Sequence, residues 1–353
     1  LNIDKPEIIT KATENISQMI DYVKEIIKNG YAYETSKGIY FDISKLDKYP
    51  VLSNRKLDDQ IAGARVDVDP EKKNPYDFAL WIKAPENHIM KWGKGRPGWH
   101  IECSTMSTKY LGSSFDFHGG GSDLIFPHHE NEIAQSKGAT GKIPAHVWMH
   151  CEYLQVDGGK MSKSLGNTYT ISQLQEKGIS PLAFKLFCFT AHYRNKLNFT
   201  FEGAYGAQKA LERLYDSYIK NANGVDDVDE DIIKEYEERF LAYINDDMNM
   251  PGAMSVVWEI ARNEKKSIKF ADLLLKFDKV LGLDMKNAEN YLLEFKHEES
   301  EELPEEIKAL VEERKQARTE KNWAKSDEIR DRIISLGYSI KDTKDGIIVK
   351  KEN

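Results

Sequence analysis

The chain has 353 residues, of which 40% are hydrophobic and 31% charged, with a formal net charge of -8. This length and composition suit two or three folded domains with their own cores. No apolar run reaches membrane-spanning length and the polar N-terminal residues lack a signal-peptide pattern, so we expect a cytoplasmic protein without membrane contact. Three cysteines cannot form a disulfide framework, and the negative net charge argues against a general nucleic-acid coat.

The first half of the chain alternates helical and strand patterns. Apolar residues spaced three and four apart predict a helix over 7–29. Aromatic and β-branched runs at 31–33 and 38–42 predict a hairpin, and 78–82 predicts another strand. Short strands, glycine turns and helices are expected over 92–150.

From about Ser180 the pattern is mostly helical. Ser180-Pro181 is a favourable helix start, and heptad-like runs predict helices over 207–222, 232–244 and 253–276. The acidic segment 287–303 predicts a linker into a final helix and a small terminal unit.

Two lysines lie three residues apart in the loop Lys160-Met161-Ser162-Lys163-Ser164. Such cations suit a polyphosphate whose charge redistributes during a reaction, although solvated surface loops often have the same composition. Letter for letter, the segment resembles the KMSKS signature of class I aminoacyl-tRNA synthetases. The resemblance implies that Lys160 and Lys163 are catalytic, holding the ATP phosphates and stabilising the pyrophosphate leaving group.

A second group of chemically capable residues lies before this loop. Six of the nine histidines fall between His100 and His150, together with Cys103. His128 and Glu132 are four residues apart at an expected helix start, so they share one face. Thiolate, imidazole and carboxylate are good zinc ligands, which makes Cys103, His128 and Glu132 candidate metal ligands. The alternative is a buried histidine bonded to a helix neighbour, and three ligands leave a fourth position open.

Three stretches, 95–104, 118–124 and 126–136, resemble cysteinyl-tRNA synthetase, and the similarity continues to the end of the chain. The implied fold is α/β plus all-α, with the second half of a Rossmann-like class I synthetase catalytic domain. The implied parts are a mixed α/β connective insertion at 1–91, the catalytic half with the zinc ligands at 92–150, the KMSKS loop and stem-contact region at 151–204, a tRNA-binding helical bundle at 205–286, the acidic linker at 287–303, and a small anticodon-binding domain at 304–353.

The resemblance also implies an activity. L-cysteine would be activated by ATP with Mg to the adenylate and transferred to tRNA(Cys), with one zinc per chain selecting the thiolate. In that family two cysteines, a histidine and a glutamate hold the zinc, and Cys103, His128 and Glu132 match three of them. The fourth ligand and the HIGH signature belong to an N-terminal part that this sequence lacks, so we expect the printed chain to be inactive alone. A monomer is expected.

Other residues near the candidate ligands have expected roles. The substrate-binding candidates are Trp99, His100, His118 and His129. The alternative for each of them is simple packing. Gly120 and Gly121 would allow the backbone to approach adenosine, and Asp123 would accept hydrogen bonds from ribose.

The other cysteines, two aromatic residues near the C-terminus and the overall function each have alternative interpretations. Cys151 and Cys188 stand in apolar contexts that predict core thiols. Trp323 and Tyr338 are candidates for stacking on RNA bases, with core packing as an equal alternative. The rival functions are a cysteine ligase that acts on an amino-sugar inositol without tRNA, and a non-catalytic RNA-binding derivative of a synthetase.

Overall fold

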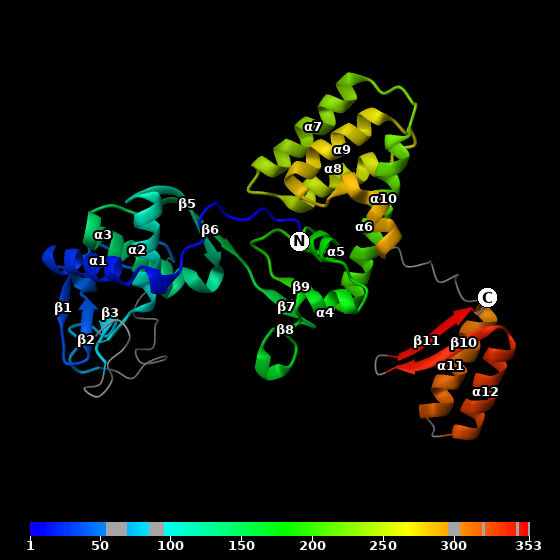
Figure 1. The fold of residues 1–353 in the computed structure, drawn as a ribbon, viewed down its shortest axis with the longest axis horizontal. Coiled ribbons are helices and arrows are strands. Elements are labelled where there is room, and N and C mark those ends of the chain that lie inside the picture. The colour runs from blue at the N-terminus through cyan, green and yellow to red at the C-terminus, as the bar shows by residue number, and fades with distance from the viewer. Residues whose placement is uncertain (54–68, 85–94, 296–303, 320–321, 344–345, 352–353) are drawn as a thin grey trace. The chain divides into compact units, whose positions relative to one another are not determined.

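The computed structural model describes residues 1–53, 69–84, 95–295, 304–319, 322–343 and 346–351 (Figure 1). The chain divides into two compact units, Leu1–Lys286 and Asn287–Asn353. The domain boundary expected between residues 91 and 92 lies outside the described residues. Within the described ranges, no helix combines the length and the apolarity that crossing a membrane requires.

The first unit opens with the helix α1 (Ile16–Lys28). The apolar spacing of three and four residues is confirmed, and the apolar face of this helix is buried. The predicted start at residue 7 is wrong. Ile8 and Ile9 are adjacent rather than spaced along one helical face, and both side chains are exposed.

An antiparallel sheet follows, with the strand order β1-β2-β3-β4. The hairpin and the further strand predicted from the sequence are confirmed. Met19 of α1 shares one buried core with Phe41 and Leu80 of the sheet. The strands are β1 (Ala32–Glu34), β2 (Gly38–Phe41), β3 (Phe78–Ile82) and β4 (Arg96–Pro97).

A parallel β-α-β unit contains most of the histidines. The strands β5 (Phe115–Gly121) and β6 (Ala145–Cys151) pair in parallel, and the helix α3 (Glu130–Thr140) lies in the connection between them. The helix α2 (Trp99–Leu111) packs against α3. Parallel pairing requires a crossover connection, usually a helix, so this unit agrees with the predicted α/β catalytic fold.

A small sheet holds the lysine loop. The strand β7 (Leu154–Val156) pairs antiparallel with β8 (Gly159–Lys160) and parallel with β9 (Leu197–Phe199). Between β7 and β8, Asp157 and Gly158 have φ angles of 49° and 75°, the left-handed backbone that a two-residue hairpin turn requires. The loop therefore starts from a tight turn.

Helices make up the rest of the first unit. Ser180 accepts a hydrogen bond from the Ala183 backbone, which confirms the predicted helix start there. The run expected over 253–276 is two helices, because the polar segment 263–267 turns the chain between them while the apolar pattern continues on both sides. The helices are α4 (Ile171–Glu176), α5 (Pro181–Cys188), α6 (Phe201–Ala222), α7 (Glu230–Asn245), α8 (Met250–Arg262) and α9 (Ile268–Leu281).

The second unit has its own buried core, which includes Ile307, Ile333 and Tyr338. The prediction of a linker over 287–303 is wrong for its first part, where a helix forms, and residues 296–303 lie outside the described part of the chain. Tyr338 packs in the core, whereas Trp323 is exposed. The elements are α10 (Ala288–Phe295), α11 (Glu305–Thr319), α12 (Trp323–Ser335), β10 (Tyr338–Thr343) and β11 (Gly346–Lys351).

Candidate metal and nucleotide site

The helix α3 is buried although many of its residues are polar. Buried polar groups cost free energy unless they are hydrogen-bonded. The Glu130 carboxylate accepts three bonds from the backbone N–H groups of residues 51–53, at 2.5 to 2.8 Å. Asn131 Oδ1 accepts a bond from Tyr49 at 2.5 Å, and Gln135 Oε1 accepts one from Ser104 at 2.6 Å. These bonds fix the orientation of α3.

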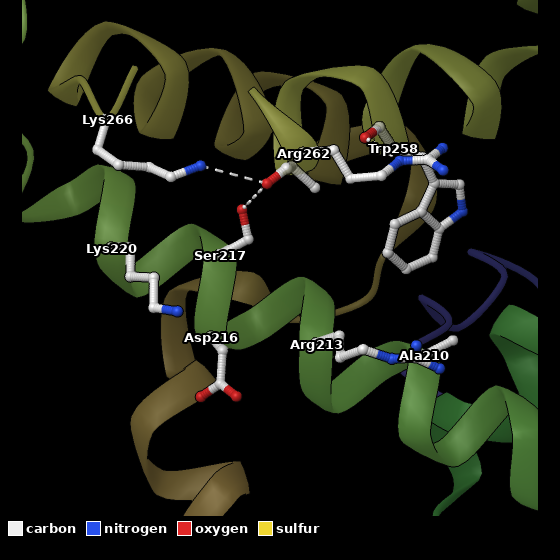
Figure 2. A pocket seen from close by; sticks show the side chains of 9 residues that line it. Ala210, Arg213, Asp216, Ser217, Lys220, Trp258, Arg262 and Lys266 are labelled. Atoms are coloured by element: carbon white, nitrogen blue, oxygen red, sulfur yellow. Dashed lines mark hydrogen bonds between the residues drawn. The ribbon is translucent and has the colours of Figure 1, made fainter. Parts of the chain in front are cut away.

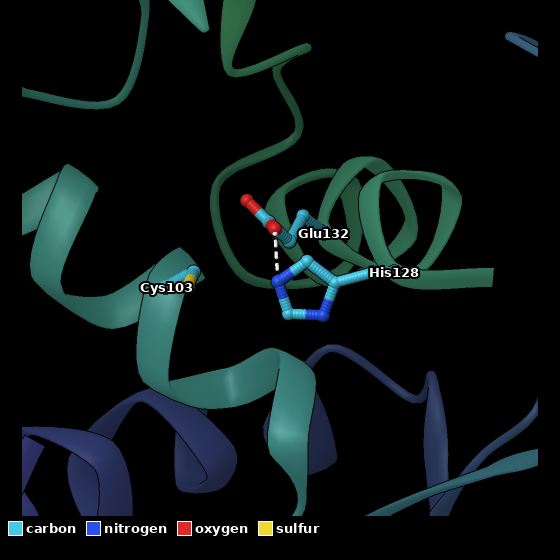
Figure 3. A group of neighbouring side chains, drawn as sticks. All are labelled: Cys103, His128 and Glu132. Carbon is cyan, nitrogen blue, oxygen red and sulfur yellow. Dashed lines mark ion pairs between the residues drawn. The ribbon is translucent and has the colours of Figure 1, made fainter. Parts of the chain in front are cut away.

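The three predicted metal ligands come together at the start of α3 (Figure 3). Cys103 lies on α2, His128 lies in the helical turn Ile125–His129, and Glu132 lies in the first turn of α3. One ligand atom from each, the thiol, an imidazole nitrogen and a carboxylate oxygen, lies within 4.8 Å of the others. His128 Nε2 is 2.9 Å from Glu132 Oε1, as their spacing of four predicts.

The buried Glu132 carboxylate tests whether these residues suit a metal. Glu132 is 2% exposed, and its Oε1 has no hydrogen-bond partner among the described residues. His128 Nε2 is close to this oxygen but does not make a directed hydrogen bond to it. A cation between the carboxylate, the imidazole and the thiol would remove the cost of the unpaired oxygen. Because one sulfur, one nitrogen and one oxygen ligand suit zinc, the residues fit that ion.

The protein alone disfavours the charged form of the Cys103 thiol. Burial raises the pKa of Cys103 to about 12, and the nearby Glu132 and Glu102 carboxylates add to the effect. A thiol must lose its proton to bind a metal, and a bound cation supplies the opposite charge that stabilises the thiolate. The thiolate and the cation therefore depend on each other at this site.

His100 orients the candidate ligand His128. The Nδ1 atoms of the two rings are 2.9 Å apart, so one donates a hydrogen to the other. Burial, and then the neighbouring His128, lowers the pKa of His100 to about 3, which keeps His100 neutral. If His128 Nδ1 carries the hydrogen, its Nε2 presents a lone pair toward Glu132, as a ligand nitrogen must.

His118 and His129 form a second group of possible ligands with the same Glu132. His118 Nε2 lies 3.3 Å from Glu132 Oε2, the carboxylate oxygen on the other side from His128. His129 Nδ1 lies 2.8 Å from His150 Nε2, and burial lowers the pKa of His129 to about 3. The two groups share one carboxylate, so Glu132 is the centre of the cluster.

The remaining predicted residues lie near this cluster. The Trp99 ring is 55% exposed and its centroid lies 4.4 Å from that of His128, so it forms an outer wall beside the imidazole. A Cβ on Gly120 would lie 2.9 Å from the His129 ring, and one on Gly121 would lie 2.5 Å from Asp123 Oδ1. Both glycines therefore make room for neighbouring side chains, a reason different from the predicted approach to adenosine.

The lysine loop is held closed by one asparagine. Asn167 Oδ1 accepts a bond from the Ser162 backbone at 2.8 Å, and its Nδ2 donates to the Lys160 carbonyl at 3.0 Å. The Lys160 side chain is exposed, and that of Lys163 lies outside the described part of the chain. Asn167, which follows the loop, thus binds the backbone of its first and third residues.

Sequence reasoning missed several contributors. Glu130, His150 and Asn167 all hold parts of the site, and their partners come from distant segments or from loop geometry that no spacing encodes. The core prediction for Cys151 is wrong, because this residue ends β6 and its side chain is exposed. Cys188 is half-buried, and burial raises the pKa of its thiol to about 11.

Comparison with known protein families shows to which class of protein the chain belongs. Residues 1–209 match the family described as tRNA synthetases class I (C) catalytic domain, and residues 300–349 match the cysteinyl-tRNA ligase anticodon binding domain. The parallel β-α-β unit and the lysine loop lie inside the first match. The chain is therefore a class I aminoacyl-tRNA synthetase.

Individual relatives narrow this class. A cysteine-tRNA ligase of Caldicellulosiruptor saccharolyticus is 41% identical over 372 residues, which cover 99% of this chain and 78% of the relative. That of Thermococcus onnurineus is 41% identical over 374 residues, and that of Actinobacillus pleuropneumoniae serotype 5b is 42% identical over 370, each with the same two coverages. The chain belongs to the cysteinyl-tRNA synthetase family and is an aminoacyl-tRNA ligase.

Proposed function

We propose that this ligase activates L-cysteine with ATP and transfers it to tRNA(Cys), and that one zinc per chain, held by Cys103, His128 and Glu132, selects the amino acid. The observation that carries the proposal is the convergence of a thiol, an imidazole nitrogen and a carboxylate oxygen within 4.8 Å of one another, at a buried carboxylate whose Oε1 has no hydrogen-bond partner among the described residues. When bound there, zinc would supply a soft Lewis acid that prefers a thiolate to a neutral hydroxyl, the difference between cysteine and serine.

The surrounding side chains prepare and enclose this site. A hydrogen bond from His128 Nδ1 to His100 would hold His128 in the tautomer that a ligand nitrogen requires, and His118 Nε2 lies 3.3 Å from the second oxygen of Glu132. His129 is kept neutral by burial and faces His150, so it adds no charge beside an incoming amino acid. Trp99 lies at the exposed side of His128, where it would cover a bound side chain.

ATP would lie between the lysine loop and the end of β5. Lys160 and Lys163 would neutralise the phosphates as pyrophosphate leaves, and Mg would accompany the nucleotide. Gly120 and Gly121 would border the adenosine, and Asp123 would accept bonds from the ribose hydroxyls. Catalysis then consists of positioning and charge stabilisation, with little acid-base work.

The acceptor would be tRNA rather than a small sugar. The match of residues 300–349 to an anticodon-binding domain favours tRNA over an amino-sugar inositol as the acceptor. In this proposal the helical bundle at 205–286 and the terminal unit at 304–353 contact the RNA. The protein would recognise the single-stranded bases of that RNA by stacking and by contacts to the base edges.

Two measurements test the proposal. In ATP-pyrophosphate exchange by the zinc-loaded full-length protein, cysteine should be activated and serine should compete poorly. Elemental analysis should find one zinc per chain, and Cys103→Ala should abolish it because the sulfur ligand is lost. Cys188→Ala is the control, because this half-buried thiol is far from the ligand group in sequence and belongs to no candidate metal group among the described residues. Full zinc in Cys103→Ala, or efficient competition by serine, would contradict the proposal.

A further inference from the structure

The lysine loop is anchored on both sides by contacts with distant parts of the chain. Before it, the Gly158 backbone N–H donates to Asn198 Oδ1 of β9 at 2.7 Å. After it, the Tyr169 ring packs edge-on against the Phe201 ring of α6, with centroids 5.0 Å apart. The chain from 161 to 168 connects these two anchors, so bonds within that segment can set its conformation.

One turn shapes the middle of this segment. The Leu165 backbone N–H donates to the Ser162 carbonyl at 3.2 Å, which closes the turn. Gly166 follows with a φ of 65°, a left-handed conformation that glycine adopts without the strain of a side chain. The turn and the glycine reverse the chain, so that the Asn167 side chain lies beside the Lys160 carbonyl.

The Asn167 amide fits this turn in one orientation. Its Oδ1 accepts a bond from the Ser162 backbone N–H at 2.8 Å, and its Nδ2 donates to the Lys160 carbonyl at 3.0 Å. Rotating the amide by half a turn would place donor against donor and acceptor against acceptor. A carboxylate of the same shape has no hydrogen to donate, so it could make only the first bond. The arrangement therefore requires an amide.

These two bonds act on the backbone that carries both lysines. Lys160 is bound through its own carbonyl, and Lys163 follows Ser162 directly. The Lys160 side chain is exposed, so the bonds order the backbone without burying this cation. Ordering a flexible loop costs conformational entropy. A loop that is already ordered when the substrate arrives avoids that cost in the transition state.

We propose that Asn167 is a positioning residue for the activation step, and that its amide holds the loop in the conformation from which Lys160 and Lys163 reach the ATP phosphates. This inference rests on the proposed function, in which these lysines neutralise the departing pyrophosphate. Asn167 acts through them rather than on the substrate. Because the lysines are needed most where charge develops, loss of the amide should lower kcat more than it changes the KM for cysteine.

The first test measures cysteine-dependent ATP-pyrophosphate exchange by the zinc-loaded full-length protein. Asn167→Ala should lower kcat about tenfold or more, because two hydrogen bonds are lost and each is equivalent to a change of about threefold to tenfold. Asn167→Asp should lower kcat at least as much, since its second oxygen would face the Lys160 carbonyl. In both variants the KM for cysteine and the zinc content should stay at the wild-type values, because Asn167 belongs to no candidate metal group among the described residues.

The second test measures the order of the loop without any substrate. Trypsin cleaves after lysine, and cleavage after Lys160 and Lys163 requires the loop to open. The rate of this cleavage should rise about tenfold in both Asn167 variants, in proportion to the population of the open form. Asn74→Ala is the matched control, because Asn74 Oδ1 also accepts a backbone bond, from Tyr76 at 3.0 Å, in a part of the chain remote in sequence from the loop. It should match the wild type in both tests.

The outcomes separate this inference from the proposed function. A wild type that does not exchange with cysteine would contradict the proposed function. If the wild type exchanges with cysteine while Asn167→Ala keeps the wild-type kcat, only the inference is overturned, whether or not the loop is cleaved faster. A fall in kcat accompanied by loss of zinc or by an equal rise in the KM for cysteine would also overturn it, because the substitution would then have damaged the fold as a whole.

Discussion

Two carboxylates of α3, Glu130 and Glu132, are both buried but differ in their hydrogen-bond partners. Glu130 accepts three backbone hydrogen bonds from residues 51–53. Glu132 faces two histidines, and one of its oxygens has no hydrogen-bond partner among the described residues. Fixed N–H groups stabilise the first charge without a ligand. The second charge lacks such support, as expected of a residue that serves a bound cation.

This contrast predicts different stabilities for two conservative variants. In metal-free protein, Glu130→Gln should lower the free energy of unfolding by about 3 kcal/mol, because charge-assisted bonds to a buried carboxylate are lost. Glu132→Gln should change it by less than about 1 kcal/mol, because the variant removes a buried charge that is poorly compensated. Urea unfolding measured on both variants and the wild type gives the comparison.

The zinc content of the same two variants should change in the opposite order to their stability. Glu130→Gln should retain zinc near the wild-type stoichiometry, and Glu132→Gln should lose most of it, since an amide oxygen is a weaker ligand than a carboxylate. Elemental analysis after dialysis would measure this. Equal loss of stability in the two metal-free variants would show that Glu132 is an ordinary structural carboxylate.

At this scale the sequence predicts some residues and necessarily misses others. His128 and Glu132 can be paired in advance, because helix geometry alone puts residues four apart on one face. Cys103 could be included only from its ligand chemistry, since no local periodicity joins α2 to α3. His150 and Glu130 have partners brought to them by β6 and by the chain at 51–53, so only tertiary packing reveals them.

Between α7 and α8, one turn is held in an unfavourable backbone conformation. Asp247 and Met248 both have φ of 52°, a left-handed conformation that side chains other than glycine disfavour. Tyr193 and Arg194 donate to the two Asp247 carboxylate oxygens at 2.5 and 2.6 Å, and His192 Nε2 lies 2.9 Å from the Asp247 carbonyl. This turn is therefore tied to the segment just before β9.

Asp247→Asn tests this link with little change of backbone preference, because asparagine tolerates the left-handed region. The variant should melt at a lower temperature than the wild type at pH 7. Bonds from Arg194, and then Tyr193, hold the pKa of Asp247 below the usual 3.8. The stabilisation by the charged form is thus fully present above about pH 4 and is lost as the pH falls through the lowered pKa. Melting curves from pH 7 to pH 3 should show the difference between the two proteins shrinking only at the acidic end.

Asp246→Asn serves as the matched control for that series, because this preceding residue is exposed and its carboxylate has no ion pair within the described ranges. It should melt as the wild type does at every pH. A difference between Asp247→Asn and the wild type that stayed constant down to pH 3 would exclude the charged form of Asp247 as its source.

The helices were predictable to the extent that their apolar faces were regular. The spacing within α1, α6 and α7 gives each helix, but it cannot show the break at 263–267, because α8 and α9 both turn their apolar faces to one bundle core. The helix α10 was not predicted, for a different reason. Its segment is rich in acidic residues, which favour a linker by composition, while Ala288 and Tyr291 are buried.

For the whole molecule, the uneven distribution of charge matters more than the total of -8. Residues 304–353 contain 12 Lys or Arg and 11 Asp or Glu, a balance of +1. A cavity between α6 and α8 also has a positive excess, because four cationic side chains and one carboxylate line it (Figure 2). An acidic protein can bind RNA through such local regions, because contacts with individual phosphates determine the counterion release. Both regions lie outside the residues proposed to hold zinc and ATP.

The division into two units, each with a buried core, allows the terminal residues proposed to contact tRNA to be removed separately from the residues proposed to hold zinc and ATP. Removal of residues 304–353 from the full-length protein should leave cysteine-dependent ATP-pyrophosphate exchange within about twofold of the wild type. It should weaken binding of the tRNA(Cys) transcript by about tenfold or more, because stacking and phosphate contacts are lost together. Calorimetry should show that the first unit keeps its own unfolding transition. Loss of exchange together with that transition would mean that the first unit depends on the second for its fold, and unchanged RNA affinity would place the RNA contacts elsewhere.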